Sequence, residues 1–81
     1  MTWAHTRRSE KDYRPAPQAI QKAFDKQVRL LENNLSHPSL RAKKYDEAVG
    51  LWQARVNRDW RFYFLIQEGM YLIVTIVPHP K

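Results

Sequence analysis

The sequence predicts a small α+β domain, in which an antiparallel sheet of about four strands carries one long helix, with a short extra helical turn, on one face. Three observations support this fold class. An apolar stripe with helical spacing runs from about residue 16 to residue 35, apolar and polar residues alternate over 51–65, and a continuous apolar run covers 71–77. We expect residues 1–81 to form a single domain, because the sequence shows no repeat or linker.

The composition points to a cytoplasmic protein with an anionic partner. The formal net charge is +6, from 14 Lys and Arg against 8 Asp and Glu. This charge favours nucleic acid, an acidic protein or an acidic membrane, and solubility alone is the alternative reason for it. There is no Cys, which excludes disulfides and thiolate metal sites. The first residues lack the apolar core of a signal peptide, and no apolar run approaches the roughly 20 residues that span a bilayer.

The first 17 residues predict a short strand and a brief helical turn. Trp3 and His5 are compatible with a strand that ends before the charged pair at 7–8. A helix start is expected at Ser9, because an acidic residue follows three positions later. Pro15 and Pro17 keep this helix short.

A long helix is predicted from Ala16 or Pro17 to about Leu35. Proline suits a first helical turn, and Pro38 prevents the helix from resuming. Its apolar stripe consists of Ile20, Phe24, Val28, Leu31 and Leu35. The segment 37–50 that follows is predicted to be a polar connection. Its basic residues are either ordinary surface charges or a border of the face described next; they are Arg41, Lys43 and Lys44.

Residues 51–66 predict two strands joined by a tight turn at 57–59. One face is expected to enter the core; it carries Trp52, Ala54, Val56, Trp60, Phe62, Phe64 and Ile66. Trp52 and Trp60 are therefore interpreted as core residues rather than as platforms for nucleic-acid bases. The opposite face would carry Gln53, Arg55, Arg61 and Tyr63. Because a guanidinium group offers a planar fork of donors that fits a phosphate, this face is suited to a phosphodiester.

The run from Tyr71 to Val77 predicts an interior strand covered on both faces. The chain then ends in Pro78, His79, Pro80 and Lys81. Histidine has an ordinary pKa of about 6.5, so a strand-end histidine is suited to moving protons near neutral pH. A plain terminal tail is the alternative for His79.

Four stretches of the sequence together resemble the RelE/ParE superfamily of toxins from toxin–antitoxin modules, and its RelE-like mRNA interferase branch in particular. They are Leu40–Lys44, Trp52–Val56, Asp59–Tyr63 and the apolar strand that ends in Pro78–Lys81. The resemblance covers about residues 16–79. It implies an antiparallel sheet flanked by helices, and a toxin that an acidic, partly disordered antitoxin wraps and neutralises. An antitoxin helix could pack on the open face at Leu51, Tyr63 and Leu65.

The resemblance implies an endoribonuclease that cleaves mRNA on the ribosome and inhibits translation without a metal or cofactor. The ribose 2′-hydroxyl attacks the adjacent phosphate, leaving a cyclic phosphate and a 5′-hydroxyl. Cations must stabilise the crowded phosphate, and an acid and a base must move the protons. The implied catalytic residues are Arg55, Arg61 and His79. The implied RNA-binding residues are Arg41, Lys43, Lys44, Gln53, Arg58 and Lys81.

The sequence departs from the RelE-like pattern at one point, and two alternative functions stay open. RelE-like toxins commonly supply a Tyr after the last strand, which this sequence lacks; Tyr63 and Tyr71 are the candidates to replace it. ParE-like toxins share the scaffold and act on DNA gyrase instead of RNA. A relative that binds nucleic acid or antitoxin without catalysis is the other alternative function.

For Arg61, a salt bridge to Asp59 is the structural alternative to a catalytic role, and Arg58 could be a phosphate clamp or a plain surface residue. No metal is assigned to His5 and His37, whose spacing is unlike that of ligands.

Overall fold

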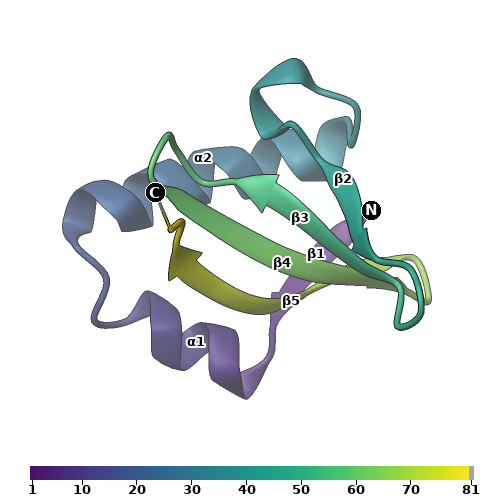
Figure 1. Ribbon diagram of the computed structural model, residues 1–81, viewed down its shortest axis with the longest axis horizontal. Helices are drawn as coiled ribbons and strands as arrows, with labels where there is room; N and C mark the ends of the chain where they lie inside the picture. Colours follow the sequence, from purple (N-terminus) through teal and green to yellow (C-terminus); the bar gives the residue numbers. More distant parts are fainter. Residues whose placement is uncertain (81) are drawn as a thin grey trace.

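The computed structural model describes residues 1–80 as a five-stranded sheet with two α-helices and one short 3₁₀ helix (Figure 1). In chain order the elements are β1 (Thr2–His5), α1 (Arg7–Tyr13), α2 (Gln18–Asn33), η1 (Pro38–Leu40), β2 (Lys43–Asp46), β3 (Leu51–Arg55), β4 (Trp60–Gln67) and β5 (Met70–Pro78). The α+β class predicted from the sequence is confirmed.

The sheet has the strand order β1-β5-β4-β3-β2, so the prediction of about four antiparallel strands was wrong in two respects. The extra strand is β2, which lies within the segment expected to be a loop and pairs antiparallel with β3. All four of its residues are exposed, so it has no apolar alternation from which to predict it. In addition, β1 pairs with β5 in parallel, with Trp3 opposite Tyr71, because the intervening helices and strands return the chain to that edge.

Helix α2 covers one face of the sheet and supplies much of the core. Ile20, Phe24, Val28 and Leu31 are buried, as the apolar stripe predicted. Phe24 meets Phe62 of β4 edge to face, with ring centroids 5.3 Å apart. The helix ends at Asn33 rather than at Leu35, which packs against the core from the connection that follows.

Helix α1 lies along the edge of β5 beyond the point where β1 ends, and is longer than the single turn expected (Figure 1). Its N-cap is Thr6, with Ser9 at the third helical position completing a capping box, so the expected start at Ser9 was three residues late. The carboxylate of Asp12 accepts hydrogen bonds from the backbone N–H of Ile76 at 3.1 Å and the hydroxyl of Thr75 at 2.6 Å. A helix side chain thus satisfies the edge of β5 where no strand pairs with it.

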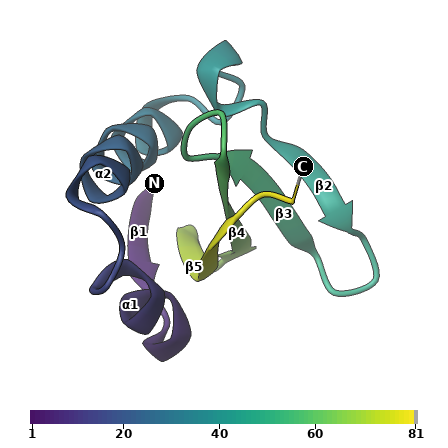
Figure 2. The ribbon, with the colours of Figure 1, turned by 60° about the vertical axis from the view of Figure 1, so that its left-hand side comes forward.

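The two faces of the sheet differ in cover. Both α-helices lie to one side of the sheet in Figure 2, and residues 1–80 leave much of the opposite face open. The prediction that β5 is covered on both faces was therefore wrong: Tyr71, Ile73 and Ile76 are buried, whereas the residues between them are only half-buried. Trp52 and Trp60 pack against the core as predicted. Ile66 is 40% exposed, because it lies near the end of β4 at the margin of the core.

Candidate functional site

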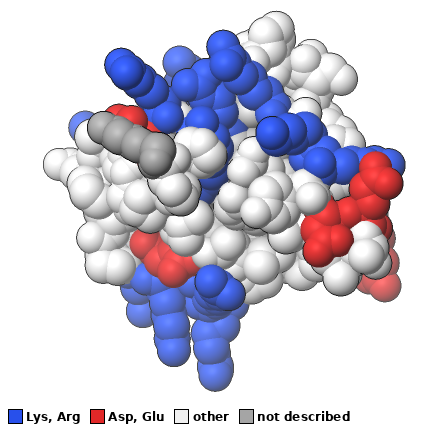
Figure 3. Space-filling model, viewed as in Figure 1, with Lys and Arg blue, Asp and Glu red and all other residues white. Residues whose placement is uncertain are grey.

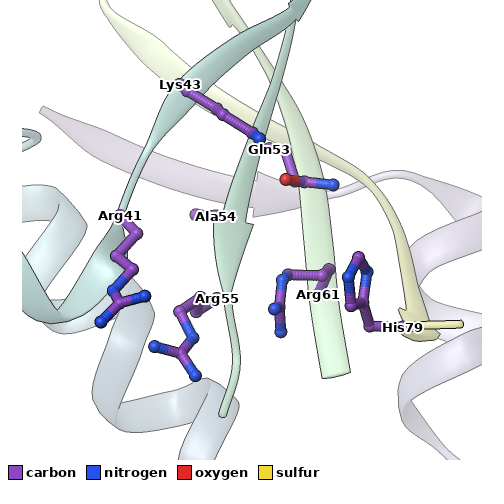
Figure 4. Close-up of a pocket in the computed structure, with 7 residues that line it drawn as sticks. All are labelled: Arg41, Lys43, Gln53, Ala54, Arg55, Arg61 and His79. Carbon is purple, nitrogen blue, oxygen red and sulfur yellow. The ribbon is translucent and has the colours of Figure 1, made fainter. Parts of the chain in front are cut away.

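A cationic groove of about 340 Å³ opens on the uncovered face of the sheet (Figure 4). Four of its seven lining residues are Lys or Arg, and none is Asp or Glu. The lining residues are Arg41, Lys43, Gln53, Ala54, Arg55, Arg61 and His79. The groove therefore offers several donors and positive charges to an anion without a competing carboxylate among its walls.

Arg55 and Arg61 occupy directly opposite positions on β3 and β4, so both side chains emerge on the open face as the alternation predicted. Figure 4 shows the guanidinium groups of Arg41, Arg55 and Arg61 extending toward the same end of the groove. The sequence placed two arginines on this face, and the fold brings a third to them.

The guanidinium group of Arg61 is held by the β3–β4 turn. Its Nη1 donates to the carbonyl oxygens of Asn57 at 2.9 Å, Trp60 at 3.0 Å and Arg58 at 3.2 Å. Burial lowers the pKa of Arg61, and the positive charge of Arg55 lowers it further. Among residues 1–80, Arg61 makes no salt bridge to Asp59, which was the structural alternative considered from the sequence.

Arg41 enters the groove because the chain turns sharply after η1. Its backbone is in the left-handed region, with φ of 45°, and its N–H donates to the carbonyl of Pro38. Leu40, immediately before it, is fully buried and anchors the turn in the core. The apolar anchor and the left-handed residue together redirect the chain into β2, which places Lys43 on the same groove.

Gln27 connects the two segments that carry Arg41 and Arg55, and the sequence reading missed it. This α2 side chain is 6% exposed, and its Nε2 donates to the carbonyl oxygens of Ser39 at 3.1 Å and Arg55 at 3.0 Å. A polar residue beside Phe24 and Val28 on the apolar face of a helix is the signal that could have identified it. Buried amides normally require such partners.

His79 reaches the groove through backbone pairing of the tail. Its N–H donates to the carbonyl of Asp59 at 2.7 Å, which fixes the residue across the β3–β4 turn. The imidazole lies beside Arg61 in Figure 4 and is exposed. The turn itself is stabilised by Asn57, whose side-chain oxygen accepts from the N–H groups of Asp59 and Trp60, each at 2.9 Å.

Some predicted residues do not line the groove. Lys44 points away from it, with Nζ 6.0 Å from the ring centroid of Trp52 on the core side of β3. Arg58 is exposed at the turn, where its backbone carbonyl contacts Arg61. Lys81 lies outside the described residues.

Of the two tyrosines considered as replacements for a terminal Tyr, Tyr71 is 5% exposed and packs against Phe64 in the core. Tyr63 lies on the open face, where its hydroxyl accepts a hydrogen bond from Gln53 Nε2 at 2.8 Å. Of these two tyrosines, Tyr63 is therefore the one that lies near the groove.

Basic side chains gather in two regions of the surface (Figure 3). One extends over the groove and β2, and the other covers α1, which carries Arg7, Arg8, Lys11 and Arg14. Within residues 1–80, no cluster of three His, Asp or Glu side chains could hold a metal ion. The helices of the described chain are too short or too polar to cross a membrane.

Solved structures with this fold are similar over nearly the whole chain. A YoeB/ParE toxin from Agrobacterium tumefaciens has a TM-score of 0.81 at 14% identity, covering 99% of this chain and 100% of its own. The toxin–antitoxin heterotetramer YoeB–YefM from Staphylococcus aureus has a TM-score of 0.78 at 13% identity, covering 99% of this chain and 98% of the matched chain. The archaeal RelE–RelB complex from Pyrococcus horikoshii has a TM-score of 0.78 at 17% identity, covering 95% of this chain and 92% of the matched chain.

No protein-family model matches the sequence, and the search of curated proteins gave no match. The structural likeness is consequently what links this chain to known proteins. The superposition extends over at least 95% of this chain and at least 92% of each of these toxins. The chain therefore has the same fold as these YoeB and RelE toxins.

Proposed function

We propose that this protein is the toxin of a toxin–antitoxin module and acts as a ribosome-dependent endoribonuclease on mRNA. The observation that carries the proposal is the convergence of Arg41, Arg55 and Arg61 on one groove that has no acidic lining residue. The fold shared with YoeB and RelE proteins supports the same function. Fold alone does not define chemistry, so the proposal depends on the groove.

In the proposed reaction the groove holds the RNA backbone, and the 2′-hydroxyl oxygen attacks the adjacent phosphorus. The bond to the 5′-oxygen breaks, giving a 2′,3′-cyclic phosphate and a 5′-hydroxyl. Arg61, fixed by the turn, stabilises the additional negative charge on the phosphate in the transition state. Arg55 lies opposite it and binds the same or the neighbouring phosphate.

Two protons move in this reaction: one leaves the 2′-hydroxyl and one reaches the departing 5′-oxygen. His79 is the group beside Arg61 whose imidazole can carry one of them, and solvent water in the open groove exchanges the other. The backbone hydrogen bond from His79 to Asp59 keeps it near the phosphate that Arg61 would hold. The chemistry requires no bound metal, because arginine supplies the positive charge.

The proposed neutralising partner is an acidic antitoxin. The YoeB–YefM structure is a toxin–antitoxin complex of a protein with this fold. An acidic segment would complement the net charge of +6 and could cover the groove. Half-buried side chains on the open face offer it apolar contact; they are Leu51, Tyr63 and Leu65.

The test is to induce the chain in cells and map the 5′ ends of mRNA against the reading frame. Cleavage in register with codons is the expected result. In a translation extract, Arg61→Ala should reduce cleavage on the order of 10² or more, because it removes a stabiliser of transition-state charge. Lys22→Ala, an exposed change on α2, is the matched control and should cleave normally.

Full cleavage by the folded Arg61→Ala protein would remove the nuclease proposal. Inhibition of DNA supercoiling with intact mRNA would replace it by a gyrase-directed toxin. Because Arg61 also supports the turn, the unfolding temperature of each variant is measured alongside. Arg61→Lys, which keeps the charge but loses the planar fork, should be intermediate in activity.

A further inference from the structure

Tyr45 is an exposed aromatic side chain beside the groove. Among residues 1–80, the large apolar side chains that are exposed are Met1, Tyr45, Val49 and Ile66, and Tyr45 is the aromatic one at 58%. It belongs to β2, two residues after Lys43, which lines the groove and pairs with Gln53. Because the ring is exposed to solvent and does not pack in the core, core packing gives no reason for an aromatic residue at this position.

The ring of Tyr45 is held in place on the open face. It contacts Tyr63 edge to face, with centroids 5.0 Å apart and an interplanar angle of 73°. Tyr63 is itself fixed by its hydrogen bond from Gln53, a groove residue that is only 8% exposed. A buried amide, a half-buried ring and an exposed ring thus extend outward from the groove, so Tyr45 presents a flat apolar surface beside it.

The combination of a cationic groove and an adjacent aromatic ring suits single-stranded nucleic acid. Backbone phosphates follow the positive charges, while bases, which all have a flat π-face, stack on aromatic side chains. Lys43 and Tyr45 emerge from one short strand, so a backbone that contacts Lys43 can direct a base toward the ring.

We propose that Tyr45 is a stacking platform for one base of a single-stranded RNA held in the groove. The inference rests on the proposed function, since it takes RNA as the occupant of the groove. Stacking of this kind is tolerant of base identity, so Tyr45 would contribute affinity and alignment without selecting a sequence. A protein partner is the competing occupant of the ring, and the test below separates the two.

The experiment measures the affinity of the full chain for a short single-stranded RNA whose 2′-hydroxyls are methylated, which prevents cleavage. A matched RNA lacks bases over a central stretch. Tyr45→Ala should weaken binding to the complete RNA by roughly 5- to 150-fold, the range for loss of one base stack. Tyr45→Phe should bind like the wild type, because it keeps the ring. Val49→Ala, an exposed apolar change in the same hairpin, should also bind normally.

On the RNA without bases, the wild type and Tyr45→Ala should bind equally. Equal affinities of the wild type and Tyr45→Ala for the complete RNA would overturn the inference. This is the result expected if the ring binds a protein partner instead. An equal loss on both RNAs would also overturn it, because the ring would then act through the groove and not through a base. Cleavage of mRNA by the wild type is measured separately. If Tyr45→Ala weakens RNA binding but the wild type does not cleave mRNA, the nuclease proposal alone is rejected. If the wild type cleaves mRNA but Tyr45→Ala binds RNA normally, the stacking proposal alone is rejected.

Discussion

At the scale of single residues, Arg61 shows how one side chain can stabilise a turn and still face a ligand. All of its hydrogen bonds to the turn come from Nη1. Because these carbonyl groups replace part of the lost hydration, the fold can accommodate this partly buried positive charge. The Nε and Nη2 groups can then face a phosphate. A lysine has one nitrogen for both tasks and could not divide them in this way.

His5 provides a prediction about stability at acidic pH. Its ring stacks on Phe24 at 5.6 Å, and its Nδ1 is hydrogen-bonded to the buried Ser9 hydroxyl at 2.7 Å. Burial lowers the pKa of His5 below its ordinary value of 6.5, and the opposing charges of Glu10 and Asp25 do not reverse the shift. The unfolded chain therefore binds this proton more tightly than the folded chain.

It follows that the contribution of His5 to the free energy of unfolding is complete above pH 6.5 and is lost as the pH falls toward its lower folded pKa. Urea unfolding over this pH window should show a smaller loss of stability for His5→Gln than for the wild type. Identical pH slopes for the two proteins would contradict the prediction. The carboxylates common to both proteins cancel in the comparison.

At the scale of elements, side chains from the helices complete the hydrogen bonding of the sheet. Asp12 of α1 satisfies the free edge of β5, and Gln27 of α2 satisfies the end of β3. The hydrogen bond from Gln27 to Ser39 also ties the segment that carries Arg41 to the helix. The helices therefore position the groove as well as covering the opposite face.

Gln27→Leu should destabilise the protein by about 1–3 kcal/mol, because two partly buried carbonyl groups lose their donor. It should also reduce RNA cleavage, since Arg41 and Arg55 would no longer be tied to one support. Gln18→Leu, at an exposed position in the first turn of α2, is the control. Denaturant unfolding measures the first effect, and unchanged stability would show that the hydrogen bonds do not contribute as argued.

At the scale of the whole molecule, positive charge is available to a partner rather than neutralised within the chain. One salt bridge, between Arg14 and Glu10, occurs among residues 1–80, although the chain has 14 Lys and Arg. Binding of RNA should consequently be strongly dependent on salt, because each neutralised phosphate releases counterions.

Replacing each of two neighbouring lysines on β2 tests whether RNA binding depends on charge in the groove or on net charge alone. Lys43 lines the groove, whereas Lys44 lies near Trp52 on the other side. Lys43→Ala should reduce the slope of log affinity against log salt by about 0.7–1, the value for one phosphate contact. Lys44→Ala should leave the slope nearly unchanged. Equal slopes for the two variants would show that net charge, and not the groove, determines RNA binding.

The sequence alone determined the features that repeat along the chain. The spacing of Ile20, Phe24, Val28 and Leu31 specifies the buried stripe of α2, and strict alternation specifies that Arg55 and Arg61 share the open face of a hairpin. Both patterns are local, since each follows from the period of a helix or a strand.

Only the tertiary structure decided the rest of the site. The strand β2 is held by backbone pairing at an exposed edge, and His79 is placed by its N–H, neither of which depends on side-chain pattern. Arg41 lines the groove, and Gln27 ties the segments that carry Arg41 and Arg55, through contacts between parts of the chain that are distant in sequence. The physical reason is that periodicity records which face of an element is buried, whereas the position of one element against another is set by long-range packing and hydrogen bonding.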